Sequence, residues 1–202
     1  MAERPRHQSP LALVLLASLS EEPMHAYRMR RLIKERGKDR IVNVARSNSV
    51  YQTINWLRQR ELVQVRETSH GQGRPDRTIY EITEKGRDAL QQWLATTLST
   101  PAREFPEFPA ALASMAATTP EEVTRHLEER AAALTRRLAE TEARRDNDAQ
   151  DVPRLFLIED EYLMAMTKAE LRWVESLIAE ITQKELTWTR DWLDTIRSTS
   201  GE

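Results

Sequence analysis

Amide and hydroxyl side chains gather in one short segment of the sequence, residues 47–59. Val50, Ile54 and Leu57 recur there at i, i+4 and i+7, which predicts a helix with one buried stripe. At about 100° per residue, the other side of this helix carries mainly uncharged polar side chains. They are Asn48, Ser49, Gln52, Asn55 and Gln59, with Thr53 on the flank. Because such side chains hydrogen-bond to base edges in the major groove of DNA, the segment predicts recognition of base pairs.

Basic residues precede and follow this segment. They are Arg28, Arg30, Arg31, Lys34, Lys38 and Arg46 before it, and Arg74 and Arg77 after it. The charge is also unevenly divided along the chain. Residues 1–100 hold 17 Lys and Arg against 11 Asp and Glu, a net charge of +6, whereas residues 101–202 hold 13 against 21, a net charge of −8. The basic half is typical of a surface that meets nucleic-acid phosphates, and the acidic half predicts a separate role.

The sequence offers little that suggests catalysis or metal binding. It has no cysteine, and no glycine-rich phosphate loop precedes a predicted helix. The histidines lie far apart and lack ligand spacing. They are His7, His25, His70 and His126. We therefore expect a protein that is not an enzyme and that binds neither a metal nor a cofactor.

The longest apolar run is too short to cross a membrane. It covers Leu11 to Leu19, whereas a spanning helix needs about 20 apolar residues. A secretory cleavage pattern does not follow this run. We expect a cytoplasmic protein without a membrane span.

Further elements are predicted around the polar helix. Ser9-Pro10 begins a helix that ends before Pro23, and a second, basic helix runs from His25 to about Arg36. Residues 62–67 and 78–82 are β-branched and aromatic runs, which predict a β-hairpin with a glycine-containing tip. Thr83 begins the next helix. Three helices followed by a hairpin have the layout of a winged helix-turn-helix domain, which we assign to residues 9–97.

The second half of the chain is predicted to be helical. Prolines and two phenylalanines mark a connecting region, residues 98–118. Thr119-Pro120 begins a long helix, and a final helix after Pro153 is predicted to reach about Ile196. The final helix carries an apolar stripe that a partner must cover, as in a dimer. The stripe consists of Met166, Trp173, Leu177, Ile181, Trp188 and Trp192. We therefore expect a mostly α-helical fold with a small β-hairpin wing, and a C-terminal dimerisation domain of long helices over residues 119–198.

An ordered set of motifs gives the chain a family resemblance. The motifs are Pro23-Met24-His25-Ala26-Tyr27, Ser47-Asn48-Ser49-Val50-Tyr51, Leu62-Val63 and Tyr80-Glu81-Ile82-Thr83-Glu84-Lys85-Gly86. In this order they resemble the DNA-binding domain of PadR-family transcriptional regulators, over about residues 10–95. The second half resembles the virulence-activator type of C-terminal domain. Ala26 and Glu61 depart from the family, which commonly has glycine at both places, so Glu61 must take the turn that ends the third helix.

The resemblance implies a sequence-specific DNA-binding regulator, a repressor, that acts as a homodimer on an inverted-repeat operator. It also implies that a small aromatic or apolar ligand modulates the regulator. The residues expected at the DNA are Arg46, Ser47, Asn48, Ser49, Tyr51, Gln52, Thr53, Asn55, His70, Arg74 and Arg77. The ligand is expected near Trp93, Phe105 and Phe108, although the same residues could form an ordinary interdomain core.

Three aromatic residues of the first half leave alternatives open. Tyr51 and Tyr80 are either core residues or phosphate contacts, and Trp56 either packs inside the domain or faces a partner. If Trp56 faces a partner, the winged domain could bind protein in place of DNA. The alternative function is therefore a protein-interaction adaptor.

Overall fold

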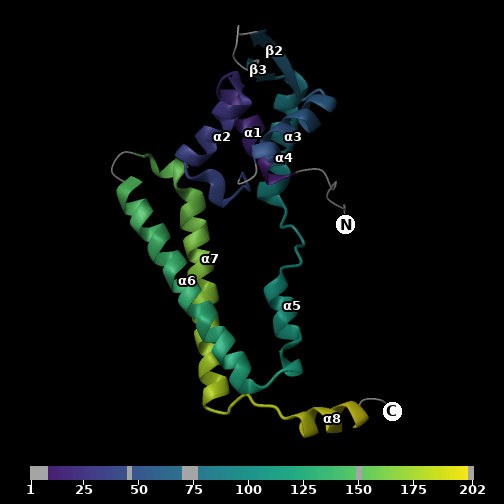
Figure 1. Ribbon diagram of the computed structural model, residues 1–202, viewed down its shortest axis with the longest axis vertical. Coiled ribbons are helices and arrows are strands. Elements are labelled where there is room, and N and C mark those ends of the chain that lie inside the picture. Colours follow the sequence, from purple (N-terminus) through teal and green to yellow (C-terminus); the bar gives the residue numbers. More distant parts are fainter. Residues whose placement is uncertain (1–8, 45–46, 70–76, 149–151, 200–202) are drawn as a thin grey trace. The chain divides into compact units, whose positions relative to one another are not determined.

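The computed structural model describes residues 9–44, 47–69, 77–148 and 152–199. The chain divides into two compact units, Met1–Glu104 and Phe105–Glu202, whose helices and strands are drawn in Figure 1. Each unit has its own hydrophobic core. The described residues are mostly helical and include one small antiparallel sheet. The predicted fold class is therefore confirmed.

The helices of the first unit begin and end close to where their capping residues predict. They are α1 (Pro10–Glu21), α2 (Ala26–Glu35), α3 (Ser47–Gln59) and α4 (Glu84–Ser99), with the short 3₁₀ helix η1 (Lys38–Arg40) after α2. The Ser9 hydroxyl accepts the Ala12 N–H at 3.0 Å, and the Thr83 hydroxyl accepts the Gly86 N–H at 3.0 Å. Both bonds satisfy backbone donors that a helix start leaves free. Gly37 follows α2 with φ of 63°, a left-handed conformation that suits glycine.

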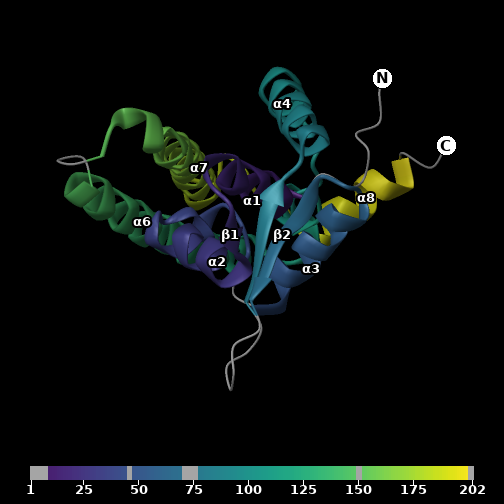
Figure 2. The same cartoon turned by 90° about the horizontal axis from the view of Figure 1, so that it is seen from above.

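The sheet has three strands, one more than the predicted hairpin. β2 (Val63–Ser69) and β3 (Arg77–Ile82) form the hairpin, and β1 (Met24–His25) pairs with the other edge of β3. The His25 Nδ1 lies 3.0 Å from the Thr78 carbonyl oxygen and adds a side-chain link between these strands. The sequence pattern missed β1 because two residues are too few to show an alternating pattern. Figure 2 shows β2 beside α3.

The core of the first unit fixes the outward direction of α3. α1 packs against α3, α4 and β3, and its Leu15 and Leu16 are fully buried. Val50, Ile54 and Leu57 of α3 are 0% exposed and belong to the same core. Burying three such side chains stabilises the domain by several kcal/mol, at about 1.5–3 kcal/mol each. This burial holds the polar side of α3 toward solvent.

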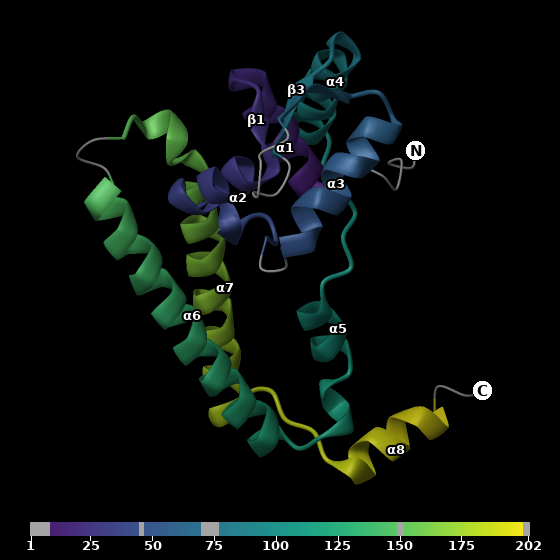
Figure 3. The same ribbon diagram turned by 45° about the horizontal axis from the view of Figure 1, so that its top comes forward.

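The second unit contains two long helices that lie side by side (Figures 1 and 3). They are α6 (Pro120–Asp148) and α7 (Ile158–Thr182). The first elements of this unit are α5 (Glu107–Ala113) and the 3₁₀ helix η2 (Met115–Ala117), which fall in the predicted connecting region, and η3 (Arg154–Phe156) precedes α7. α6 begins where predicted, because the Thr119 hydroxyl accepts the Glu122 N–H at 3.3 Å and the Glu122 carboxylate accepts the Thr119 N–H at 3.4 Å.

The prediction of one final helix reaching Ile196 is wrong. α7 ends at Thr182, and a separate helix, α8 (Arg190–Thr199), follows. Lys184 takes the left-handed conformation with φ of 61°, and the Leu186 N–H donates to the Glu180 carbonyl oxygen at 3.1 Å, which closes the end of α7. The Trp188 Nε1–H then donates to the Thr118 carbonyl oxygen at 2.7 Å. This long-range bond, which local sequence does not show, ties the segment between α7 and α8 to the start of α6.

In the described parts of the chain, none of the helices is both long and apolar enough to span a membrane.

Candidate nucleic-acid interface

α3 presents a polar face to solvent, directly opposite its buried stripe. The exposed residues of this helix are Asn48, Tyr51, Gln52, Asn55, Arg58 and Gln59. Between them, the buried positions recur with the helical period, so the two faces alternate along the sequence as the pattern predicts. The helix contains no aspartate or glutamate. Its solvent face is therefore uncharged apart from Arg58 and can approach a polyanion.

Two hydroxyls expected on this face are turned toward the backbone. The Thr53 hydroxyl donates to the Ser49 carbonyl oxygen at 2.8 Å, and the Ser49 hydroxyl lies 3.4 Å from the Asn43 carbonyl oxygen. Both residues are only partly exposed. Their hydroxyl protons are thus engaged locally, and each oxygen keeps only its acceptor capacity. Ser47 lies at the start of α3, and Arg46 lies outside the described residues.

The strands β2 and β3 lead to the expected wing. His70 and Arg74 lie outside the residues that the structure describes, and Arg77 is the first residue of β3. At the base of the wing, the Gln64 amide donates to the Glu81 carboxylate at 2.8 Å, and Arg66 lies 3.9 Å from the same carboxylate. Glu81 thus compensates positive charge on the flank of β2.

The cations of α2 are partly used within that helix. Arg31 forms an ion pair with Glu35 at 2.7 Å, and Arg28 lies 3.4 Å from the same carboxylate. Lys34 is exposed, and Tyr27 beside them is 68% exposed. The positive charge that α2 can offer to DNA phosphates is therefore smaller than a count of its basic residues indicates.

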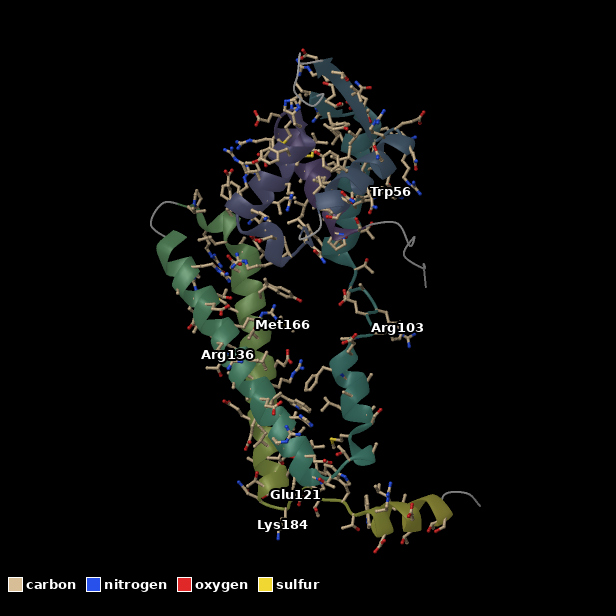
Figure 4. The ribbon with its side chains drawn as sticks, viewed as in Figure 1. Trp56, Arg103, Glu121, Arg136, Met166 and Lys184 are labelled. Atoms are coloured by element: carbon tan, nitrogen blue, oxygen red, sulfur yellow. The ribbon has the colours of Figure 1, made fainter. Side chains whose placement is uncertain are left out.

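The structure gives different positions to the aromatic residues whose roles the sequence left open. Tyr80 is buried in the core, whereas Tyr51 is 50% exposed on α3. Trp56, labelled in Figure 4, is partly buried and packs against Trp93 with ring centroids 6.3 Å apart. The Arg60 guanidinium covers the Trp56 ring at 4.0 Å. Trp56 therefore packs inside its unit, which removes the feature that favoured a protein-binding adaptor.

The residues expected to hold a small ligand have packing partners in their own units. Trp93 lies in the core of the first unit. In the second unit, Phe108 contacts the Trp173 ring edge-on at 6.2 Å, and the Arg130 guanidinium lies 3.5 Å from the Phe108 ring. Phe105 is 82% exposed. Trp93 and Phe108 are therefore packed in the cores of their units, whereas Phe105 is not, and the ligand site stays a prediction.

The residues expected at a dimer interface fall into two sets. Leu177, Ile181 and Trp188 are buried in the core that α6 and α7 share within one chain. Met166, Trp173 and Trp192 are about half exposed. The break between α7 and α8 explains part of this division, since the six residues do not lie on one continuous helix. Only the exposed set is available to a second molecule.

A groove of about 680 Å³ lies beside the C-terminal end of α3. It is lined by Asn55, Arg58, Gln59, Glu61, Val63, Gln64, Val65 and Thr83. Arg58 and Gln59 were not among the residues expected at the DNA. For Gln59 the signal was its spacing, because it lies on the same helical line as Asn48 and Gln52, whereas Arg58 lies off that line.

Glu61 forms the corner between α3 and β2. It has φ of 61°, the left-handed conformation for which the family commonly uses glycine. The Lys85 ammonium lies 2.7 Å from its carboxylate, and this hydrogen bond lowers the pKa of Glu61 from its ordinary value. The same lysine compensates the charge of Glu61 at the edge of the groove. The turn that ends α3 is thus formed by a non-glycine residue, as the sequence requires.

Within the described ranges, His, Asp and Glu side chains do not form a group that could hold a metal ion.

Comparisons with known proteins agree with this geometry. Residues 15–92 match the family described as the transcriptional regulator PadR-like family. No curated protein matches the chain. Among solved structures, PadR of Bacillus subtilis in complex with operator DNA is similar with a TM-score of 0.68 and 16% identity, covering 86% of this chain and 99% of that one. The same PadR in complex with p-coumaric acid has a TM-score of 0.67 and 16% identity, covering 85% and 98%.

A second relative supports the prediction for the C-terminal half. The virulence activator AphA of Vibrio cholerae is similar with a TM-score of 0.64 and 18% identity, covering 86% of this chain and 99% of that one. At these identities the solved structures establish the fold, which extends over both units. The match over residues 15–92 identifies the kind of domain, and it confirms the prediction that the chain is not an enzyme. Residues 15–92 thus form a domain of the transcriptional regulator PadR-like family.

Proposed function

We propose that this protein binds a specific DNA sequence as a homodimer and represses transcription from it. The observation that carries the proposal is the exposed amide face of α3, held outward by Val50, Ile54 and Leu57, which are 0% exposed. A helix of this size fits the major groove, where amide side chains distinguish base pairs. The solved complex of Bacillus subtilis PadR with operator DNA supports the same use of the fold.

The proposed division of labour separates base contacts from phosphate contacts. Asn48, Gln52 and Asn55 read base edges from α3. Arg46, His70, Arg74 and Arg77 contact the backbone or the minor groove, as their positions around α3 and the wing indicate. Base contacts determine which sequence is bound, whereas phosphate contacts raise the affinity for every sequence. We place the protein in the cytoplasm with its DNA.

The homodimer is supported by an apolar face of α7 that stays about half exposed among the described residues of the second unit. Ile158, Tyr162, Met166 and Trp173 are each about half exposed or more. Their spacing places them within an arc of about 80° on one side of the helix, and Figure 4 labels Met166 there. A two-fold axis along such a face would cover it in both copies. A dimer whose two α3 helices lie about one duplex turn apart, roughly 34 Å, would then read two half-sites. The operator is then an inverted repeat.

A small aromatic or apolar ligand is proposed to release the DNA. The p-coumaric acid complex of Bacillus subtilis PadR supports a ligand of this class. The ligand must bind the DNA-free conformation more tightly than the DNA-bound one, because equal affinity for both would shift nothing. Titrating p-coumaric acid into the protein–operator complex tests this part, and unchanged operator affinity would contradict it for this ligand.

The experiment that tests the function is selection from a randomised duplex library by the full-length protein at two salt concentrations. We expect enrichment of an inverted repeat with half-sites about one turn apart. Salt-sensitive retention without a motif would contradict sequence-specific binding. Retention at neither salt would contradict DNA binding and would favour the protein-interaction adaptor. Placing the selected repeat upstream of a reporter gene then tests repression, which predicts lower expression when the protein is present.

A further inference from the structure

Four amides form a continuous line along the exposed side of α3. Asn48, Gln52, Asn55 and Gln59 are all exposed, and their spacing of four, three and four residues keeps them within an arc of about 60°. At 1.5 Å per residue, the line is about 16 Å long. That length corresponds to about five base-pair steps of 3.4 Å. The line therefore includes Asn48, Gln52 and Asn55, which are proposed to read base edges, and continues to Gln59.

The side chains of this line are available to a ligand. None of the four makes a side-chain hydrogen bond with any other residue that the structure describes. The neighbouring hydroxyls differ in this respect, because Ser49 and Thr53 turn their protons toward backbone carbonyls. Along this line, the outward hydrogen-bonding groups are carboxamides, each of which offers one acceptor and two donors.

Carboxamides discriminate among base pairs in a particular way. Asn and Gln form paired hydrogen bonds with N6 and N7 of adenine, whereas Arg and Lys pair with guanine and Asp and Glu accept from cytosine. α3 contains no acidic residue, and its one cation, Arg58, lies about 100° around the helix from Gln59. The line itself thus contains adenine-reading side chains and no guanine-reading one.

The flank of the line offers contacts of a different kind. Tyr51 and Arg58 lie seven residues apart on one side of the amides, and both are exposed. Arg58 has no ion-pair partner among the described residues, and it lines the 680 Å³ groove together with Gln59 and Gln64. A phenolic hydroxyl and a guanidinium at this position are suited to phosphate oxygens on one strand.

We propose that α3 reads a half-site rich in A·T pairs along its whole length, from Asn48 to Gln59. The four amides contact adenines over about five consecutive base pairs in the major groove, and Tyr51 and Arg58 contact the adjacent phosphates. This inference rests on the proposed DNA-binding function and deepens it, since it names the bases and adds Gln59 and Arg58 to the interface.

The first test repeats the randomised-duplex selection with wild-type protein and with Asn48→Ala, Gln59→Ala and Gln91→Ala. Gln91 is an exposed glutamine on α4 and serves as the matched control. Wild-type protein is expected to enrich A·T pairs over four or five consecutive positions in each half-site. Asn48→Ala and Gln59→Ala are each expected to reduce the preference about tenfold at opposite ends of that run, and Gln91→Ala is expected to leave it unchanged.

The second test separates base reading from DNA shape, since A·T tracts can also be selected for a narrow minor groove. Replacing the adenines of the selected half-site by 7-deazaadenine removes N7 and leaves Watson–Crick pairing intact. We expect each replacement under the amide line to weaken binding about tenfold. If affinity is unchanged by the replacement, the A·T preference arises from shape and the inference is overturned.

The salt dependence of DNA binding tests the proposed contact between Arg58 and phosphate. Arg58→Ala is expected to lower the slope of log affinity against log salt by about one and to leave the selected sequence unchanged. Arg87→Ala, which removes an exposed arginine from α4, is the control and should not alter the slope. An Arg58→Ala slope equal to that of wild type would remove Arg58 from the interface.

Different results would contradict the inference of A·T reading and the proposed function of sequence-specific DNA binding. If wild-type protein selects a G·C-rich half-site, or if the A·T preference survives both amide substitutions, this inference is wrong while sequence-specific binding stands. If wild-type protein selects no sequence at all, the proposed function itself is wrong.

Discussion

Gln52 and Ile54 lie two positions apart on α3 and face opposite environments. Ile54 is 0% exposed in the core, whereas Gln52 is exposed among the other amides. Substitutions at the two positions must therefore act on different properties. Truncating Ile54 would remove core packing and cost about 2–5 kcal/mol of stability, whereas truncating Gln52 would remove hydrogen-bonding groups that face solvent.

The first prediction separates specificity from affinity. Asn48→Ala or Gln52→Ala is expected to reduce discrimination between operator and non-operator DNA by about 1–3 kcal/mol, because each removes a base contact. Arg74→Ala or Arg77→Ala is expected to weaken binding to both kinds of DNA and to flatten the salt dependence, because each removes a proposed phosphate contact. Competition binding at several salt concentrations measures both effects. The division would be refuted if the two classes of variant behaved alike.

The second prediction concerns Gly86, in the first turn of α4. A Cβ atom at this position would lie 2.1 Å from the Leu62 carbonyl oxygen and 2.8 Å from the Ile82 side chain. Leu62 cannot move freely, since its carbonyl oxygen accepts the Thr83 N–H at 3.1 Å. Gly86→Ala is therefore expected to lower the free energy of unfolding by about 3 kcal/mol. Urea denaturation measures this loss.

A helix-propensity change in the same element provides the control for Gly86. Ala95→Gly, at an exposed position of α4, should cost only about 1 kcal/mol. If Gly86→Ala cost no more than Ala95→Gly, the close approach between α4 and the corner after α3 would be looser than the structure shows.

At the scale of elements, local signals predicted most helix starts. Ser9, Thr83 and Thr119 each cap the helix that follows, as their side-chain chemistry indicates. The stripe of α3 predicted its buried face for the same reason, since a 3.6-residue period is a property of the local sequence. These features could be predicted because each depends on residues within one or two helical turns.

Features that depend on distant residues could not be predicted in this way. β1 exists because Met24 and His25 pair with Tyr80 and Ile79. The break after α7 is stabilised by Trp188, which bonds to Thr118, seventy residues earlier. At the candidate site, the sequence predicted the amides of α3, but the packing of Trp56 on Trp93 required the folded domain.

The third prediction concerns an ion pair that joins α1 to the end of α2. Both carboxylate oxygens of Glu21 accept hydrogen bonds from the Arg36 guanidinium at 2.7 Å. The bonds from Arg36 lower the pKa of Glu21, and partial desolvation opposes them weakly. A lowered folded-state pKa stabilises the fold above the pKa of an unpaired glutamate, about 4.3. This stabilisation is lost as the pH falls through the folded-state pKa.

The pH dependence of melting tests this pair. Wild-type protein is expected to melt slightly above Glu21→Gln at pH 7, and the difference should shrink between about pH 5 and pH 3. The effect is small because both side chains are about half exposed. Arg36→Gln should show the same pH dependence as Glu21→Gln, since either change breaks the pair. A difference that persisted unchanged to pH 3 would contradict the assignment to Glu21.

At the scale of the whole molecule, the described residues of the second unit leave part of the apolar surface of α7 exposed. α7 buries Val174, Leu177 and Ile181 within its own unit, yet Met166 and Trp173 on another face stay 52% and 49% exposed. A contiguous exposed apolar face of this kind is typical of a protein–protein interface. Two recognition helices are also needed to read an inverted repeat, so dimerisation and DNA reading are expected to fail together.

The last prediction tests whether DNA binding depends on dimerisation. Two variants each place one lysine on a different face of α7. Met166→Lys places a charge on the exposed apolar face and is expected to shift the protein from dimer to monomer in sedimentation velocity. Glu175→Lys, at an exposed position about 160° around the helix from Trp173, should leave the dimer intact. The Met166→Lys monomer should bind the operator far more weakly because it contacts one half-site at a time. If Met166→Lys stayed dimeric at concentrations where Glu175→Lys is dimeric, a different surface would have to hold the two chains together.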